Sequence, residues 1–143
     1  MEDHPNPPTV VLVDDDEENR RLLAASLADD FALVGEFGTA AEAVAGAVEL
    51  RPDVVLMDLR LPDMSGIEAT RQIIDQAWPT QVIVLTAYDG TLPTRSAQAV
   101  GAFTYLTKGS QIGVIRSAIL RAWALKKALG RHRDRAGARS GAD

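Results

Sequence analysis

A short segment in which an apolar run leads into a polar loop constrains the fold of this chain more than any other feature. Residues 54–57 read Val-Val-Leu-Met, and Asp58 follows them, ahead of a loop that contains Pro62 and Gly66. A continuous apolar run of this length is typical of a strand buried on both faces of a parallel sheet. Open α/β sheets form their binding sites at the carboxyl ends of such strands. Asp58 is therefore a candidate site residue, although a cap at a strand–loop junction explains it equally well.

The rest of the chain alternates between buried strands and helices. The predicted strands cover residues 9–13, 31–37, 53–57, 82–85 and 102–106. The first predicted helix starts at residue 17, and the other four cover residues 39–50, 65–77, 93–100 and 110–129. Such alternation predicts right-handed βαβ crossovers between neighbouring strands. We therefore expect an α/β fold, in which one doubly wound, five-stranded parallel sheet carries helices on both faces.

Length, charge and composition exclude several classes of protein. The 143 residues suffice for one domain, which we place at 9–129 between a disordered lead (1–8) and a disordered basic tail (130–143). A net charge of −5 argues against direct nucleic-acid binding, and the tail resembles no helix-turn-helix or aromatic platform. The absence of cysteine excludes disulfides and thiolate metal sites. With no signal peptide and no membrane-spanning run, we expect a cytoplasmic location without membrane contact.

Polar side chains follow four of the five predicted strands. Asp14 and Asp15 come after the first strand, Asp58 after the third, Thr86 after the fourth and Lys108 after the fifth. Because parallel strands end at one edge of a sheet, these side chains should converge there. Clustered carboxylates repel one another unless they share a cation, and oxygen-only ligands suit Mg²⁺ or Mn²⁺. An ammonium and a hydroxyl beside such a site could stabilise a phosphoryl group that Asp58 accepts as nucleophile.

Four motifs occur in order at these strand ends. They are Val-Leu-Val-Asp-Asp-Asp with Arg20, Val-Val-Leu-Met-Asp-Leu-Arg-Leu-Pro-Asp-Met-Ser-Gly, Val-Ile-Val-Leu-Thr-Ala and Gly-Ala-Phe-Thr-Tyr-Leu-Thr-Lys. Together they resemble the receiver domain of two-component response regulators over residues 9–129. The resemblance implies the flavodoxin-like receiver fold with strand order 2-1-3-4-5. It also implies a phosphorelay signalling module, not a turnover enzyme, that receives its phosphoryl group from a sensor histidine kinase or a histidine phosphotransfer protein.

The same resemblance implies roles for the acidic residues. Asp58 corresponds to the phosphoacceptor, which becomes an aspartyl phosphate. Asp15 corresponds to a direct Mg²⁺ ligand and Asp14 to a ligand that acts through water, while the backbone carbonyl of Arg60 completes the metal site. Asp16 matches no required role, and we interpret it as an acid at the start of a helix.

Other positions correspond to the switch and to the control of phosphoryl lifetime. Thr86 and Lys108 match the phosphate-binding and switch positions. Tyr105 resembles the aromatic residue that turns inward on activation, a role that is compatible with its simpler interpretation as a half-buried strand aromatic. Arg60 and Tyr88 stand two residues after Asp58 and Thr86, respectively. Their bulk could screen the phosphoryl group from water and lengthen its lifetime.

The resemblance places the contact with a downstream effector or output domain at about residues 94–129. The last predicted helix stays apolar toward its end, at Trp123, Leu125 and Leu129. Three interpretations compete for this segment: a long final helix, a homodimer contact, or a helical lead into an output domain. The heptad pattern is too weak to choose among them.

Two other functional classes fit parts of the pattern. A haloacid-dehalogenase-like phosphohydrolase also uses Asp, Mg²⁺, Thr and Lys on a parallel sheet. That family places its nucleophile after the first strand as Asp-x-Asp-x-Thr/Val, whereas residues 14–18 here are Asp-Asp-Asp-Glu-Glu. A pseudo-receiver that serves only as a docking module is the third class, and the complete set of acids, Thr86 and Lys108 argues against it.

Overall fold

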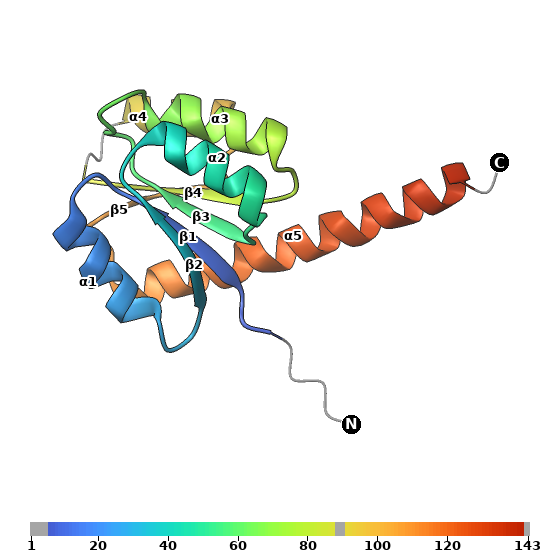
Figure 1. Ribbon diagram of the computed structural model, residues 1–143, viewed down its shortest axis with the longest axis horizontal. Coiled ribbons are helices and arrows are strands. Elements are labelled where there is room, and N and C mark those ends of the chain that lie inside the picture. The colour runs from blue at the N-terminus through green and yellow to red at the C-terminus, as the bar shows by residue number, and fades with distance from the viewer. Residues whose placement is uncertain (1–5, 88–90, 142–143) are drawn as a thin grey trace.

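The computed structural model describes residues 6–87 and 91–141 and contains five strands that alternate with five helices (Figure 1). The strands are β1 (Thr9–Val13), β2 (Ala32–Phe37), β3 (Val54–Met57), β4 (Gln81–Thr86) and β5 (Thr104–Thr107). The helices are α1 (Glu17–Leu27), α2 (Ala40–Leu50), α3 (Gly66–Gln76), α4 (Thr91–Ala99) and α5 (Ile112–Gly141). All neighbouring strands pair in parallel in the order β2-β1-β3-β4-β5, which confirms the predicted fold class.

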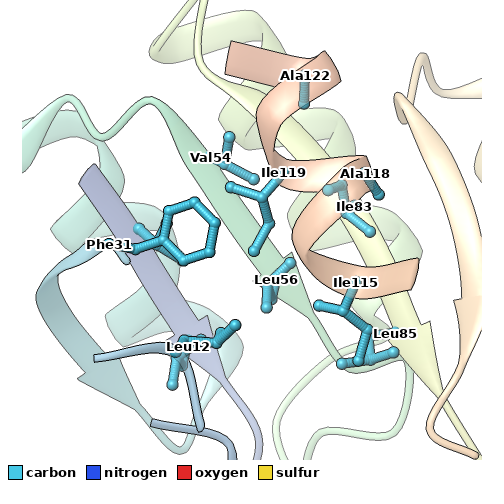
Figure 2. Close-up of a cluster of buried hydrophobic side chains, with 12 residues drawn as sticks. Leu12, Phe31, Val54, Leu56, Ile83, Leu85, Ile115, Ala118, Ile119 and Ala122 are labelled. Atoms are coloured by element: carbon cyan, nitrogen blue, oxygen red, sulfur yellow. The ribbon is translucent and has the colours of Figure 1, made fainter. Parts of the chain in front are cut away.

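Two hydrophobic clusters cover the two faces of the sheet, because successive residues of a strand point to opposite sides. Leu12 of β1 lies in the cluster that packs against α5 around Ile119 (Figure 2). Its neighbour Val11 lies in the other cluster, which includes Ile73 of α3. Every residue of the central strand β3 is at most 2% exposed. The apolar run that opened the sequence analysis is thus the buried centre of the sheet.

Side-chain caps fix where helices begin just beyond the strand ends. The carboxylate of Asp16 accepts a hydrogen bond from the Asn19 N–H at 3.1 Å and so caps α1. The hydroxyl of Thr39 accepts from the Glu42 N–H at 3.2 Å and donates to the Glu42 carboxylate at 2.8 Å. The helices therefore start at defined points on the rim formed by the carboxyl ends of the strands.

Helix α5 runs further than the sequence predicted. It begins at Ile112 and continues to Gly141, so that its far end projects past the sheet (Figure 1). Near the edge of the sheet, Lys126 Nζ lies 2.7 Å from Asp53 Oδ1, which ties α5 to the start of β3. Residues 130–141 are thus helical where we expected disorder, and the domain limit at residue 129 stays a prediction. In the described ranges, none of the helices combines the length and apolar character needed to cross a membrane.

Candidate functional site

The carboxyl ends of β1 and β3 bring three aspartates together. One carboxylate oxygen from each of Asp14, Asp15 and Asp58 lies within 4.8 Å of the others. Asp14 and Asp58 are 9% and 6% exposed, whereas Asp15 is open to solvent. Because β1 and β3 are adjacent in the sheet, residues far apart in the chain meet at one rim, as the predicted topology required.

Lys108 lies between two of these carboxylates. It follows the last residue of β5, and its Nζ lies 2.7 Å from Asp14 Oδ2 and 3.0 Å from Asp58 Oδ2. Its backbone N–H donates to the Thr86 carbonyl at 2.7 Å, so the turn after β5 is fixed to the end of β4. The ammonium group therefore reaches the acidic cluster from a strand that does not neighbour β1 or β3.

Burial and charge act against each other in this cluster. Burial raises the pKa of Asp58, and the hydrogen bond and charge of Lys108 offset that effect only in part. Burial, the largest single effect, would lower the pKa of Lys108, but the hydrogen bonds to Asp14 and Asp58 and the negative charges of these residues together outweigh burial and raise the pKa. The two carboxylates therefore favour the protonated, cationic form of Lys108, whereas the burial of the Asp58 carboxyl group is only partly compensated.

Thr86 and Tyr105 lie on neighbouring strands. Thr86 is buried at the end of β4, with an exposure of 1%. Tyr105 is half-buried in β5 and pairs with Val84, two residues before Thr86. Tyr105 also lines a cavity of about 120 Å³ with Thr94 and other residues of α4, β5 and the segment between them. Tyr105 thus borders an open volume that residues of α4 also line.

The loop after Asp58 is held tightly against the end of β3. The Arg60 N–H donates to Asp58 Oδ1 at 3.3 Å, and the Gly66 N–H donates to the Leu59 carbonyl at 2.9 Å. A Cβ at position 66 would lie 2.1 Å from the Asp58 carbonyl oxygen, so only glycine fits there. The Arg60 side chain is exposed, and Tyr88, the other proposed lifetime residue, lies outside the described residues.

Two further residues organise the rim, and sequence reasoning gave neither of them a role. Arg20 Nη1 donates to the Asp14 carbonyl at 2.5 Å, and its Nε lies 3.4 Å from Glu36 Oε1. Asp63 accepts hydrogen bonds from the backbone of α2. Both residues belong to the quoted motifs, but their partners lie on other elements, and no periodicity or spacing in the sequence reports such contacts.

Comparison with known proteins gives this arrangement a family. Residues 10–120 match the family described as response regulator receiver domain. The chain belongs to this family. Receiver domains are signalling domains, and the fold and the clustered acids of this chain are those of a receiver domain in a two-component system.

Individual relatives support the same assignment. The receiver domain is 43% identical over 93 residues to transcriptional regulatory protein LiaR of Bacillus subtilis (strain 168), an alignment that covers 63% of this chain and 43% of LiaR. It is 38% identical over 92 residues to response regulator GacA of Pseudomonas viridiflava, which covers 64% of this chain and 42% of GacA. The chain therefore spans less than half the length of these curated relatives.

A solved structure agrees with the sequence comparison. A two-component response regulator of the LuxR family from Aurantimonas sp. SI85-9A1 superposes on the receiver domain with a TM-score of 0.74 and 34% identity. The superposition covers 85% of this chain and 88% of that structure. The likeness therefore extends over most of the chain and is not confined to one motif.

The acidic cluster fits the Mg²⁺ that receiver domains bind in an acidic pocket. Three carboxylates and one ammonium leave two negative charges on the rim, which a divalent cation would neutralise. All the side-chain donors are carboxylate oxygens, the ligand type that Mg²⁺ prefers. The solvent exposure of Asp15 leaves room for the water ligands that Mg²⁺ usually keeps.

Proposed function

We propose that the receiver domain is a switch in which Asp58 accepts a phosphoryl group, with Mg²⁺, from a sensor histidine kinase or a histidine phosphotransfer protein. The observation that carries the proposal is the position of Asp58 within 4.8 Å of Asp14 and Asp15, and 3.0 Å from the ammonium of Lys108. This arrangement supplies a buried nucleophile together with the positive charge that its product needs.

In the proposed reaction, a carboxylate oxygen of Asp58 attacks the phosphorus of a phosphohistidine. The new O–P bond forms as the P–N bond breaks, and the leaving imidazole keeps the electron pair and takes up a proton. Asp14, Asp15, Asp58 and the carbonyl of Arg60 would hold Mg²⁺, which neutralises charge on the phosphoryl oxygens. The Lys108 ammonium, which donates a hydrogen bond to the Asp58 carboxylate before the reaction, then donates it to a phosphoryl oxygen instead.

The switch is proposed to involve Thr86 and Tyr105. The Thr86 hydroxyl, at the end of β4, moves to donate a hydrogen bond to a phosphoryl oxygen, and this movement frees space for the ring of Tyr105 to turn inward. The cavity lined by Tyr105 beside α4 supports the proposal, because the packing there leaves volume for a rearrangement. The change would reach a partner through residues 94–129.

The partner is proposed to be an effector or output domain, with a second copy of the chain as the alternative. LiaR is described as a transcriptional regulatory protein, and the receiver domain matches less than half of its length. The receiver domain itself is proposed to accept one phosphoryl group and lose it slowly, without turning over a substrate.

The test is intact-mass analysis after incubation with acetyl phosphate and Mg²⁺, with Asp58→Asn as the control. We expect wild type to gain a single phosphoryl group that hydroxylamine removes, and Asp58→Asn to gain none. Absence of the gain in wild type, or an equal gain in both proteins, contradicts the proposal. Catalytic release of phosphate from many equivalents of substrate would instead favour the phosphohydrolase class.

A further inference from the structure

We infer that Asp63 is a positioning residue that joins the phosphoacceptor loop to the start of α2 and thereby sets the geometry of the metal site. The inference rests on the proposed function, because it concerns how the same rim holds Mg²⁺. Asp63 itself touches none of the proposed reacting groups.

The contact is a two-pronged one between a carboxylate and a helix start. Asp63 Oδ1 accepts from the Ala40 N–H at 2.8 Å, and Oδ2 accepts from the Ala41 N–H at 2.9 Å. The first N–H groups of a helix lack partners within the helix, and its N-terminus attracts negative charge. These two donors hold the pKa of Asp63 below its usual value, so the ionised carboxylate is the form that makes the contact.

The loop that carries Asp63 is also held against Asp58 and the residue that follows it. The hydrogen bond from Gly66 to Leu59 closes the loop, and Gly66 packs directly on the Asp58 carbonyl. Arg60, whose carbonyl is the proposed metal ligand, lies between Asp58 and Asp63. A displacement of Asp63 would therefore be transmitted to a ligand of the metal.

The segment that leads into α2 is in turn held against Asp14 and Asp15, the two acids at the end of β1. The Asp14 N–H donates to the Phe37 carbonyl at 3.0 Å, at the end of the strand that leads to α2. A Cβ at Gly38 would lie 3.9 Å from both the Asp14 carbonyl oxygen and the Asp15 Cα, so this backbone packs against the acidic loop. Asp63 thus connects the loop of Asp58 to the support of Asp14 and Asp15.

A matched control exists at the same helix start. The Glu42 carboxylate accepts from the Thr39 hydroxyl at 2.8 Å, and both residues belong to the α2 cap. Glu42→Ala therefore weakens the start of α2 without changing the link to the phosphoacceptor loop. Asp63→Ala removes that link and leaves the capping box in place.

The first measurement is the binding of Mg²⁺ alone to the full chain by isothermal titration calorimetry. We expect Asp63→Ala to raise the Kd for Mg²⁺ by about three- to tenfold, at or below the usual range for groups that orient metal ligands. Glu42→Ala should change it by less than about twofold, and Asp63→Asn, which keeps one acceptor oxygen, should give an intermediate value. The Ala40 and Ala41 amides should exchange with solvent faster in Asp63→Ala than in wild type.

The second measurement separates metal binding from chemistry. With acetyl phosphate, Asp63→Ala should be phosphorylated at nearly the wild-type rate in saturating Mg²⁺, and more slowly at low Mg²⁺. An unchanged Kd in Asp63→Ala, or an equal rise in Asp63→Ala and Glu42→Ala, overturns the inference and leaves the proposed function standing. If wild type binds Mg²⁺ but takes up no phosphoryl group, the proposed function fails, and the Kd values still decide the role of Asp63.

Discussion

The ammonium of Lys108 lies 3.0 Å from Oδ2 of Asp58, although 50 positions separate the two residues in the chain. The contact exists because β5 and β3 end at the same rim, with β4 between them. The positive charge that stabilises the Asp58 carboxylate thus comes from Lys108, a residue in the part of the receiver domain that is proposed to move. In the proposed mechanism, this contact would link the phosphoacceptor to the strand that carries Tyr105.

Removal of this cation should slow phosphorylation more than it disturbs the fold. Lys108→Ala leaves the charges of Asp14 and Asp58 without their shared partner and removes a donor to the proposed phosphoryl group. We expect the rate with acetyl phosphate at saturating Mg²⁺ to fall at least about tenfold, given typical losses for one such donor. Lys108→Arg, which keeps the charge, should retain more activity than Lys108→Ala, and equal rates in all three proteins would contradict this role.

The pH dependence of stability should report the same contact. The pKa of Lys108 is raised above its ordinary 10.5, so the folded protein holds this proton more tightly than the unfolded chain does. The resulting stabilisation is fully present below about pH 10.5 and is lost as the pH rises through the folded pKa. Urea unfolding of wild type and Lys108→Met across this range should give curves that converge at high pH, and a constant difference would argue against the linkage.

Gly66 should tolerate no side chain. The Cβ of Gly66→Ala would meet the Asp58 carbonyl oxygen at 2.1 Å, and the backbone at this point cannot rotate aside as a flexible side chain would. We expect a loss of about 1–3 kcal/mol in the free energy of unfolding, as for other overpacked sites. Gly109→Ala is the matched control, because nothing lies within 4 Å of a Cβ there. Urea denaturation measures the free energy of unfolding of both variants. An equal loss in Gly66→Ala and Gly109→Ala would contradict the steric role of Gly66.

Arg60 and Tyr88 are predicted to lengthen the life of the aspartyl phosphate. The double variant Arg60→Ala, Tyr88→Ala should lose its phosphoryl group faster than wild type, because water reaches the phosphorus more easily. The decay is followed by intact mass after removal of acetyl phosphate. Leu22→Ala, a change at an exposed position on α1, serves as a surface control. A decay as slow as that of wild type would exclude the shielding role.

The sheet and the meeting of its acids could be predicted because each depends on short-range pattern and topology. The apolar run 54–57 indicated a strand buried on both sides, and parallel pairing alone brings Asp58 next to Asp14. The bond between Asp63 and α2 could not be predicted, since it depends on how the helix start is placed against a loop. The length of α5 escaped for another reason. The segment after residue 129 lacks core-forming residues, and we therefore expected disorder there. Its alanines and arginines nevertheless favour a helical backbone, even where the helix is not buried.

The ion pair between Lys126 and Asp53 connects the proposed phosphoacceptor strand to α5. Asp53 stands just ahead of β3 and Asp58 just after it, so the two ends of one strand hold the anchor of α5 and the proposed phosphoacceptor. Helix α5 begins near the reactive rim and leaves the sheet at the opposite edge (Figure 1). If the proposed phosphorylation shifts β3, the Asp53–Lys126 ion pair gives the shift a direct connection to α5 on the side of the sheet away from Asp58.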